Sequence, residues 1–190
     1  GGNQNGAGGV QRGVMTGRED DLDLVAASRA GDKDAFGELV RRYQGRLYPT
    51  ALRLTGRAED ALDLLQDAFL RAYRKLGQFR GQSSFYTWLY RLMVNQALSM
   101  RRRRRLVNGQ PHETTSSLEL AADPDLNDPA APLERAERDR QVQQALDALA
   151  PDHRAVLVMK DLDGMRYEEI DATLGIPIGT VRSRQHRARG

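Results

Sequence analysis

Apolar side chains recur every three to four residues along most of the chain, which is the spacing of one face of an α-helix. The pattern is clearest over residues 58–76, where eight apolar side chains follow the helical period. Helix ends are marked too. Asp32 or Asp34 can cap the start of a helix that ends at Gly56, and Pro49 should bend or interrupt this helix. The sequence therefore predicts an all-α protein.

Two stretches lack this periodicity. Residues 1–17 are rich in glycine, with asparagine and glutamine between, and should form a disordered tail. Residues 107–132 are acidic, contain no lysine or arginine and hold four of the seven prolines, so they should form a flexible linker. These boundaries predict two small helical domains, residues 18–106 and 133–190, joined by the acidic linker.

Composition excludes several functions. The chain has no cysteine, which rules out disulfides and thiolate metal sites and suits the cytoplasm. No apolar run approaches the roughly 20 residues needed to span a bilayer, so membrane insertion is not expected. The histidines His112, His153 and His186 lie far apart in sequence, and no nucleotide-binding or hydrolase motif is present. We therefore expect no metal, no cofactor and no catalytic residue.

Residues 79–105 combine aromatic side chains with positive charge. A polar loop is followed by four aromatic residues at positions 85–90, by apolar positions at helical spacing, and by five consecutive arginines at 101–105. Bases of an unpaired strand stack on aromatic rings at about 1–3 kcal/mol each, and arginines bind phosphates. The pattern fits a surface for single-stranded nucleic acid about as well as it fits a core helix with a solvated basic end.

The helix predicted over residues 58–76 carries an acidic stripe. Asp60, Asp63 and Asp67 fall at spacings of three and four, and basic residues crowd the C-terminal turns. Acidic residues early and basic residues late complement the helix dipole, which explains part of the pattern. The dipole does not require three aspartates along one edge, so a docking face for a basic partner is an equally good interpretation.

A helix-turn-helix is predicted near the C-terminus. Tyr167 begins a short helix, Gly175 lies at its end, and a second helix begins near Thr180. The second helix carries four arginines and no acidic residue, which is typical of a recognition helix in the major groove of DNA. Because the turn and the basic helix occur together, we favour DNA binding over a solvated basic helix.

Three blocks of sequence, in this order and spacing, match a known family pattern. They are DALDLLQDAFLRAYRKL at residues 60–76, FRGQSSFYTWLYRLMVNQAL at residues 79–98 and YEEIDATLGIPIGTVRSRQHRAR at residues 167–189. Together they resemble bacterial sigma factors of the extracytoplasmic-function group, within the primary sigma family. The resemblance implies a region-two helical bundle, then a linker, then a region-four helix-turn-helix. It implies an alternative sigma factor that binds core RNA polymerase, recognises two promoter elements in DNA, melts the promoter to initiate transcription and is held by an anti-sigma factor.

The resemblance also implies roles for particular residues. The acidic helix would dock on polymerase, the stretch from residue 79 would hold the unpaired strand, and the last helix would read duplex DNA. The polymerase-binding residues would be Asp60, Asp63, Gln66, Asp67 and Phe69. The single-strand residues would be Phe79, Arg80, Ser83, Trp88, Asn95, Arg101, Arg102 and Arg103, with Phe79, Ser83 and Asn95 forming a pocket for a flipped base. The duplex-binding residues would be Thr180, Arg182, Ser183, Arg184, His186 and Arg187.

Three positions depart from the family pattern. Leu62 stands where the family often has glutamate, so one acidic contact to polymerase is expected to be missing. Asp171 and Gln185 stand where small or apolar residues are common, and each would cost about 1–3 kcal/mol if buried without a hydrogen bond.

Two other classes of function stay open. A sigma mimic would titrate an anti-sigma factor without touching DNA, but the arginine run and the basic last helix argue against it. An ordinary helix-turn-helix regulator would act alone on duplex DNA, and it would leave the aromatic stretch and the aspartate stripe unexplained.

Overall fold

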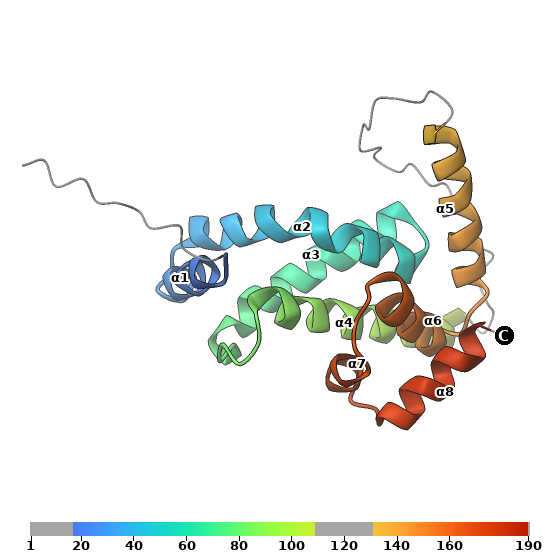
Figure 1. The fold of residues 1–190 in the computed structure, drawn as a ribbon. Coiled ribbons are helices and arrows are strands. Elements are labelled where there is room, and N and C mark those ends of the chain that lie inside the picture. The colour runs from blue at the N-terminus through green and yellow to red at the C-terminus, as the bar shows by residue number, and fades with distance from the viewer. Residues whose placement is uncertain (1–16, 109–130, 190) are drawn as a thin grey trace, which may run out of the picture.

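The computed structural model describes residues 17–108 and 131–189, and the regular structure within these ranges is entirely helical (Figure 1). The all-α prediction is therefore confirmed. The predicted tail and linker lie outside the described residues, except for their ends, where Gly17 begins the first helix and the helices on either side of the linker extend slightly into it.

Within the described residues, the N-terminal half contains four α-helices and a short 3-10 turn, and the C-terminal half contains four α-helices and one π-helical turn. The first set comprises α1 (Gly17–Arg29), α2 (Lys33–Thr55), α3 (Ala58–Lys75), η1 (Leu76–Gln78) and α4 (Phe85–Asn108). The second set comprises α5 (Ala131–Asp147), α6 (Pro151–Leu157), the π-helical turn η2 (Val158–Leu162), α7 (Tyr167–Leu174) and α8 (Ile178–Arg189).

Helix α2 begins and ends where the sequence predicts. The Asp32 side chain accepts hydrogen bonds from the backbone N–H groups of Asp34 and Ala35, at 2.9 and 3.1 Å. Gly56 ends the helix in the left-handed conformation, with φ of 86°. Of the two predicted effects of Pro49, a bend or an interruption, the interruption is wrong, because α2 runs through Pro49 as one element. Pro49 is exposed, while Leu47 and the residues that follow it pack into the core and hold the helix together.

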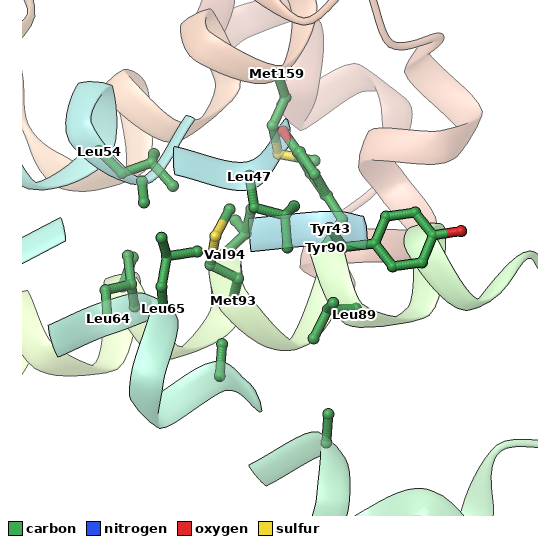
Figure 2. Close-up of a cluster of buried hydrophobic side chains, with 14 of the residues drawn as sticks. Tyr43, Leu47, Leu54, Leu64, Leu65, Leu89, Tyr90, Met93, Val94 and Met159 are labelled. Atoms are coloured by element: carbon green, nitrogen blue, oxygen red, sulfur yellow. The ribbon is translucent and has the colours of Figure 1, made fainter. Parts of the chain in front are cut away.

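The two helical halves pack against each other and share one hydrophobic core. Residues of α2, α3 and α4 form most of it, and the C-terminal half adds a further group of buried residues: Leu146, Ala155, Val156, Val158, Met159, Ile170 and Val181. Figure 2 shows Met159, from η2, pointing toward Tyr90 of α4 and Leu47 of α2. The sequence predicts two helical domains, and the structure adds that they meet over a buried surface.

The helix-turn-helix is formed by α7 and α8, with Gly175 at the end of α7 in the left-handed conformation, at φ of 65°. Gln185 of α8 is 7% exposed, but both ends of its amide are satisfied. The Tyr167 hydroxyl donates to Gln185 Oε1, and Gln185 Nε2 donates to Asp161 Oδ1, both at 2.8 Å. Burial of Gln185 therefore does not carry the free-energy cost of an unsatisfied polar group. Asp171, the other polar residue at an unusual position, is only partly buried.

Candidate functional site

Helix α3 presents an acidic face. Asp63, Gln66 and Asp67 are exposed, and Asp60 is partly buried near the start of the helix. Gln96 of α4 donates to Asp67 Oδ2 at 3.4 Å and accepts from Arg71 Nη1 at 2.7 Å, so one end of the face is held against α4. The carboxylate of Asp63 projects into solvent, where a basic partner could reach it.

Beside the acidic face lies an apolar groove of about 340 Å³, lined by Lys33, Phe36, Phe69, Leu70 and Tyr73. The predicted contact residue Phe69 is 7% exposed, so it forms part of the groove wall and core. Leu62, Leu70 and Tyr73 of α3 are 58, 46 and 39% exposed. These three exposed apolar side chains were not predicted from the sequence, although α3 has more apolar positions than one buried face can hold.

The aromatic cluster at the start of α4 is largely internal. The Phe79 ring is 3% exposed and packs against Phe85 and Trp88, with ring centroids 5.8 and 5.3 Å apart. Phe79 therefore has no ring face open for a base in this structure. Its backbone carbonyl and that of Leu76 accept hydrogen bonds from Arg29, which fixes the start of the loop at residues 79–84.

Other residues near this loop are accessible. Arg80 is exposed, and Ser83 and Trp88 are partly exposed. Tyr86 is also partly exposed, and the guanidinium of Arg46 lies 4.4 Å from the centre of its ring. A cation stacked on an aromatic ring is a common feature of single-strand binding surfaces. The pair could not be predicted from the sequence, because Arg46 and Tyr86 are on different helices and neither residue is unusual by itself.

The other single-strand candidates lie farther along α4. Asn95 donates to the backbone carbonyl of Thr173 in α7 at 3.0 Å, and Arg101 donates to the carbonyl of Thr55 at 3.0 Å. Arg102 and Arg103 are exposed. At 1.5 Å per residue, Trp88 and Arg102 are about 21 Å apart along the helix. Trp88, Asn95 and Arg102 therefore follow one side of α4 and do not gather in a single pocket, whereas Arg101 points toward α2.

The candidate recognition helix α8 has one basic, solvent-facing side. Arg182, Ser183, His186 and Arg187 are exposed, and Thr180 is partly buried at the start of the helix. Arg184 is 24% exposed and turns toward α6, where its Nη2 lies 3.3 Å from Asp152 Oδ2. At the end of the helix, Arg189 forms hydrogen bonds of 2.9 and 2.5 Å with Asp161 that lower the pKa of this carboxyl. The ion pair anchors α8 to η2.

Among the described residues, no three histidine, aspartate or glutamate side chains come together in a way that could hold a metal ion. Within the same ranges, every helix is too short or too polar to cross a bilayer.

Two family models match the chain: Sigma-70 region 2 over residues 39–107 and Sigma-70, region 4 over residues 139–190. The RNA polymerase sigma-H factor of Pseudomonas aeruginosa is 39% identical over 179 residues, covering 92% of this chain and 93% of that protein. The ECF RNA polymerase sigma-E factor of Escherichia coli K12 is 37% identical over 173 residues, covering 89% of this chain and 90% of that protein.

Two solved structures are also similar. One is CnrH in complex with the cytosolic domain of CnrY, with a TM-score of 0.60 and 29% identity, covering 90% of this chain and 92% of that chain. The other is the sigma factor RpoE of Bartonella quintana with the anti-sigma factor NepR, with a TM-score of 0.59 and 26% identity, covering 81% of this chain and 91% of that chain.

A helical bundle with an acidic face on α3, followed by a helix-turn-helix whose second helix is basic, matches both sigma regions and defines the class as bacterial sigma factors. Within that class, the chain belongs to the sigma-70 family as a member of its extracytoplasmic-function group. The expected extracytoplasmic-function group is therefore confirmed, but placing it within a primary sigma family was imprecise, since similar chains are named as extracytoplasmic-function factors.

Proposed function

We propose that this sigma factor binds core RNA polymerase through α3, holds the unpaired promoter strand along α4 and reads duplex promoter DNA with α8. It would act in the cytoplasm and would itself catalyse no reaction. The observation that carries the proposal is that both sigma regions occur in one chain, which is similar to named sigma factors over about nine tenths of its length.

The polymerase contact is assigned to the face of α3 that contains Asp60, Asp63, Gln66 and Asp67. Exposed carboxylates support it because they would attract a basic surface on the polymerase. The exposed side chains of Leu62, Leu70 and Tyr73 support it because apolar residues among charges are typical of protein interfaces. Leu62, which lacks the acidic group expected there, would then contribute apolar contact. Phe69 would act from the wall of the groove.

The single-strand contact is assigned to the loop at residues 80–84 and the side of α4 that carries Asn95 and Arg102. Arg80, Ser83 and Trp88 would contact the first unpaired bases, and Phe79 would hold Trp88 in position by packing against its ring. Asn95 would follow, and Arg101, Arg102 and Arg103 would bind phosphates. Flipping a base out of the duplex costs a few kcal/mol, and stacking on the partly exposed ring of Trp88 would offset it.

The duplex contact is assigned to α8. Thr180, Arg182, Ser183, His186 and Arg187 occupy its accessible side, and Arg184 would join them after release from Asp152. We expect Arg184→Ala to relax sequence preference at one base pair, with a loss of about 1–3 kcal/mol of discrimination there. Binding to a panel of single-base variants of a promoter would measure this.

Arg187→Ala provides the comparison, because Arg187 is an exposed arginine of the same helix, three residues further along it. If Arg184→Ala weakened binding to every sequence equally, Arg184 would be a phosphate contact and its assignment to base reading would be wrong.

An anti-sigma factor is the further partner that we propose. CnrH and RpoE were each solved with a second protein, and NepR is named as an anti-sigma factor. The likeness of this chain to both proteins supports a similar partner here.

Run-off transcription with core bacterial polymerase, with and without the chain, tests the proposed function. The chain should direct polymerase to a short set of start sites in a genomic promoter library. If transcription were stimulated from no promoter in the library, the proposal would be rejected. Binding to an anti-sigma factor without any transcription would instead favour the sigma mimic.

A further inference from the structure

The C-terminal half lies against α4 on the side assigned to single-stranded DNA (Figure 1). Arg91, Asn95 and Arg102 share one face of this helix, since they are four and seven residues apart. Asn95 is hydrogen-bonded to the Thr173 carbonyl of α7, and the Nε atom of Arg91 is buried without a hydrogen-bond partner. In this arrangement α7 occupies part of the track that a DNA strand would follow.

One carboxylate joins the two halves at the centre of their interface. Asp163 lies just after η2 and is 15% exposed. It accepts hydrogen bonds from the Thr50 hydroxyl at 2.9 Å, the Tyr90 hydroxyl at 2.7 Å and Arg53 Nη1 at 3.4 Å. Thr50 and Tyr90 are each 3% exposed, so both donors would lose their partner if Asp163 were removed while the halves stayed together.

A second carboxylate pairs with arginines from both candidate DNA surfaces. Asp152 of α6 places Oδ1 3.8 Å from Arg102 of α4 and Oδ2 3.3 Å from Arg184 of α8. Both arginines are assigned to DNA in the proposed function. A carboxylate between two arginines occupies the electrostatic position that a phosphate would take.

We propose that this arrangement is a self-inhibited state of the free chain, in which the C-terminal half covers the single-strand surface and Asp163 holds it closed. Asp152 strengthens the closure by neutralising Arg102 and Arg184. The inference rests on the proposed function, because it takes α4 and α8 to be the DNA-binding surfaces. Promoter DNA then binds only the open population, and its apparent affinity falls in proportion to the fraction of chain that is open.

The chain offers a matched control for Asp163. Asp161 is two residues earlier, but its carboxylate binds Gln185 and Arg189, both within the C-terminal half. Asp163→Ala should therefore open the interface, whereas Asp161→Asn should leave it closed. The two variants separate the loss of an interface contact from the loss of any carboxylate in this turn.

Opening is measured by energy transfer between dyes on the full-length chain. Because the native sequence has no cysteine, single cysteines in place of Gln44 of α2 and Glu168 of α7 are labelled specifically; both positions are exposed. The second measurement is fluorescence anisotropy with a labelled, mixed-sequence single-stranded DNA. Circular dichroism confirms that each variant keeps its helical content.

Asp163→Ala is expected to reduce energy transfer and to raise the affinity for single-stranded DNA about tenfold or more, since a hydrogen bond to a charged group is worth roughly ten- to a hundredfold in an equilibrium constant. Asp161→Asn should change neither. If Asp163→Ala proves misfolded, Thr50→Val removes one donor at nearly constant volume and should shift both measurements in the same direction by less.

The proposal is overturned if a folded Asp163→Ala leaves energy transfer unchanged, or if energy transfer falls without a gain in DNA affinity. It is also overturned if Asp161→Asn opens the chain equally, or if a folded Thr50→Val, used in place of a misfolded Asp163→Ala, changes neither measurement. If the proposed function itself were wrong, the run-off transcription experiment would show it, because the native chain would then direct no transcription by core polymerase.

Discussion

Replacing Asp63 and Asp67 together with arginine is expected to weaken binding of the chain to core RNA polymerase by about a hundredfold or more, which corresponds to about 2.7 kcal/mol. Both carboxylates are exposed on α3, so the folded state should tolerate the change. The double charge reversal would replace attraction to a basic partner with repulsion, and like charges facing each other in an interface cost several kcal/mol. Competition binding against a labelled sigma factor measures the effect.

The matched control reverses two exposed acidic residues elsewhere, Asp23 of α1 and Asp139 of α5. This variant has the same net charge as the α3 variant but should bind polymerase normally. Both variants should also retain the duplex-DNA affinity of the native chain. A loss of DNA affinity in the α3 variant, without a loss of polymerase binding, would show that α3 is not the polymerase face.

Replacing Arg154 with methionine should lower the free energy of unfolding by about 3–5 kcal/mol, because it breaks a buried ion pair and leaves one partner behind. Arg154 is 1% exposed, and its Nη1 lies 2.7 Å from Asp147 Oδ1 and 3.4 Å from the Leu54 carbonyl. Burial, together with nearby Arg101, lowers the pKa of Arg154 to about 10, which shows how poorly solvated the charge is. Urea denaturation measures the change.

Removing both charges should be less harmful than removing one. In the double variant Arg154→Met, Asp147→Asn, the remaining amide keeps a hydrogen-bond partner in Gln143 and no charge stays buried. Arg57→Met is the surface control: the Arg57–Glu59 pair is exposed, and its loss should cost at most about 1 kcal/mol. If the double variant were no more stable than the Arg154→Met single variant, the destabilisation would not come from an unpaired Asp147.

The helices were predictable because each has its own local signals. The apolar period identifies α3, and Asp32 and Gly56 mark the ends of α2, all within a few residues of the feature they predict. The acidic character of α3 and the basic character of α8 were predictable in the same way. Charge and exposure on a helix follow from its own residues once the buried face is known.

Which aromatic rings face inward was not predictable from the same information. Phe79 and Trp88 are both aromatic residues of the same aromatic-rich stretch, and the sequence does not distinguish them. In the structure the Phe79 ring is buried in the aromatic cluster at the start of α4, whereas Trp88 is partly exposed. The interface between the halves was still harder to predict. Asp163 is a single aspartate in a turn, and its partner Thr50 is 113 residues away. Nothing near either residue in the sequence indicates that they meet.

The π-helical turn η2 directs Asp161 and Asp163 toward different parts of the protein. The Asp163 N–H donates to the Val158 carbonyl at 2.9 Å, so the backbone makes a wider turn here than an α-helix does. Asp161 consequently faces α8, whereas Asp163 faces α2 and α4. Deleting a single codon from this turn would rotate the second carboxylate by about 100° and detach it from Thr50 and Tyr90. Evolution could therefore reset how readily such a protein engages promoters while every DNA-contacting side chain stays intact.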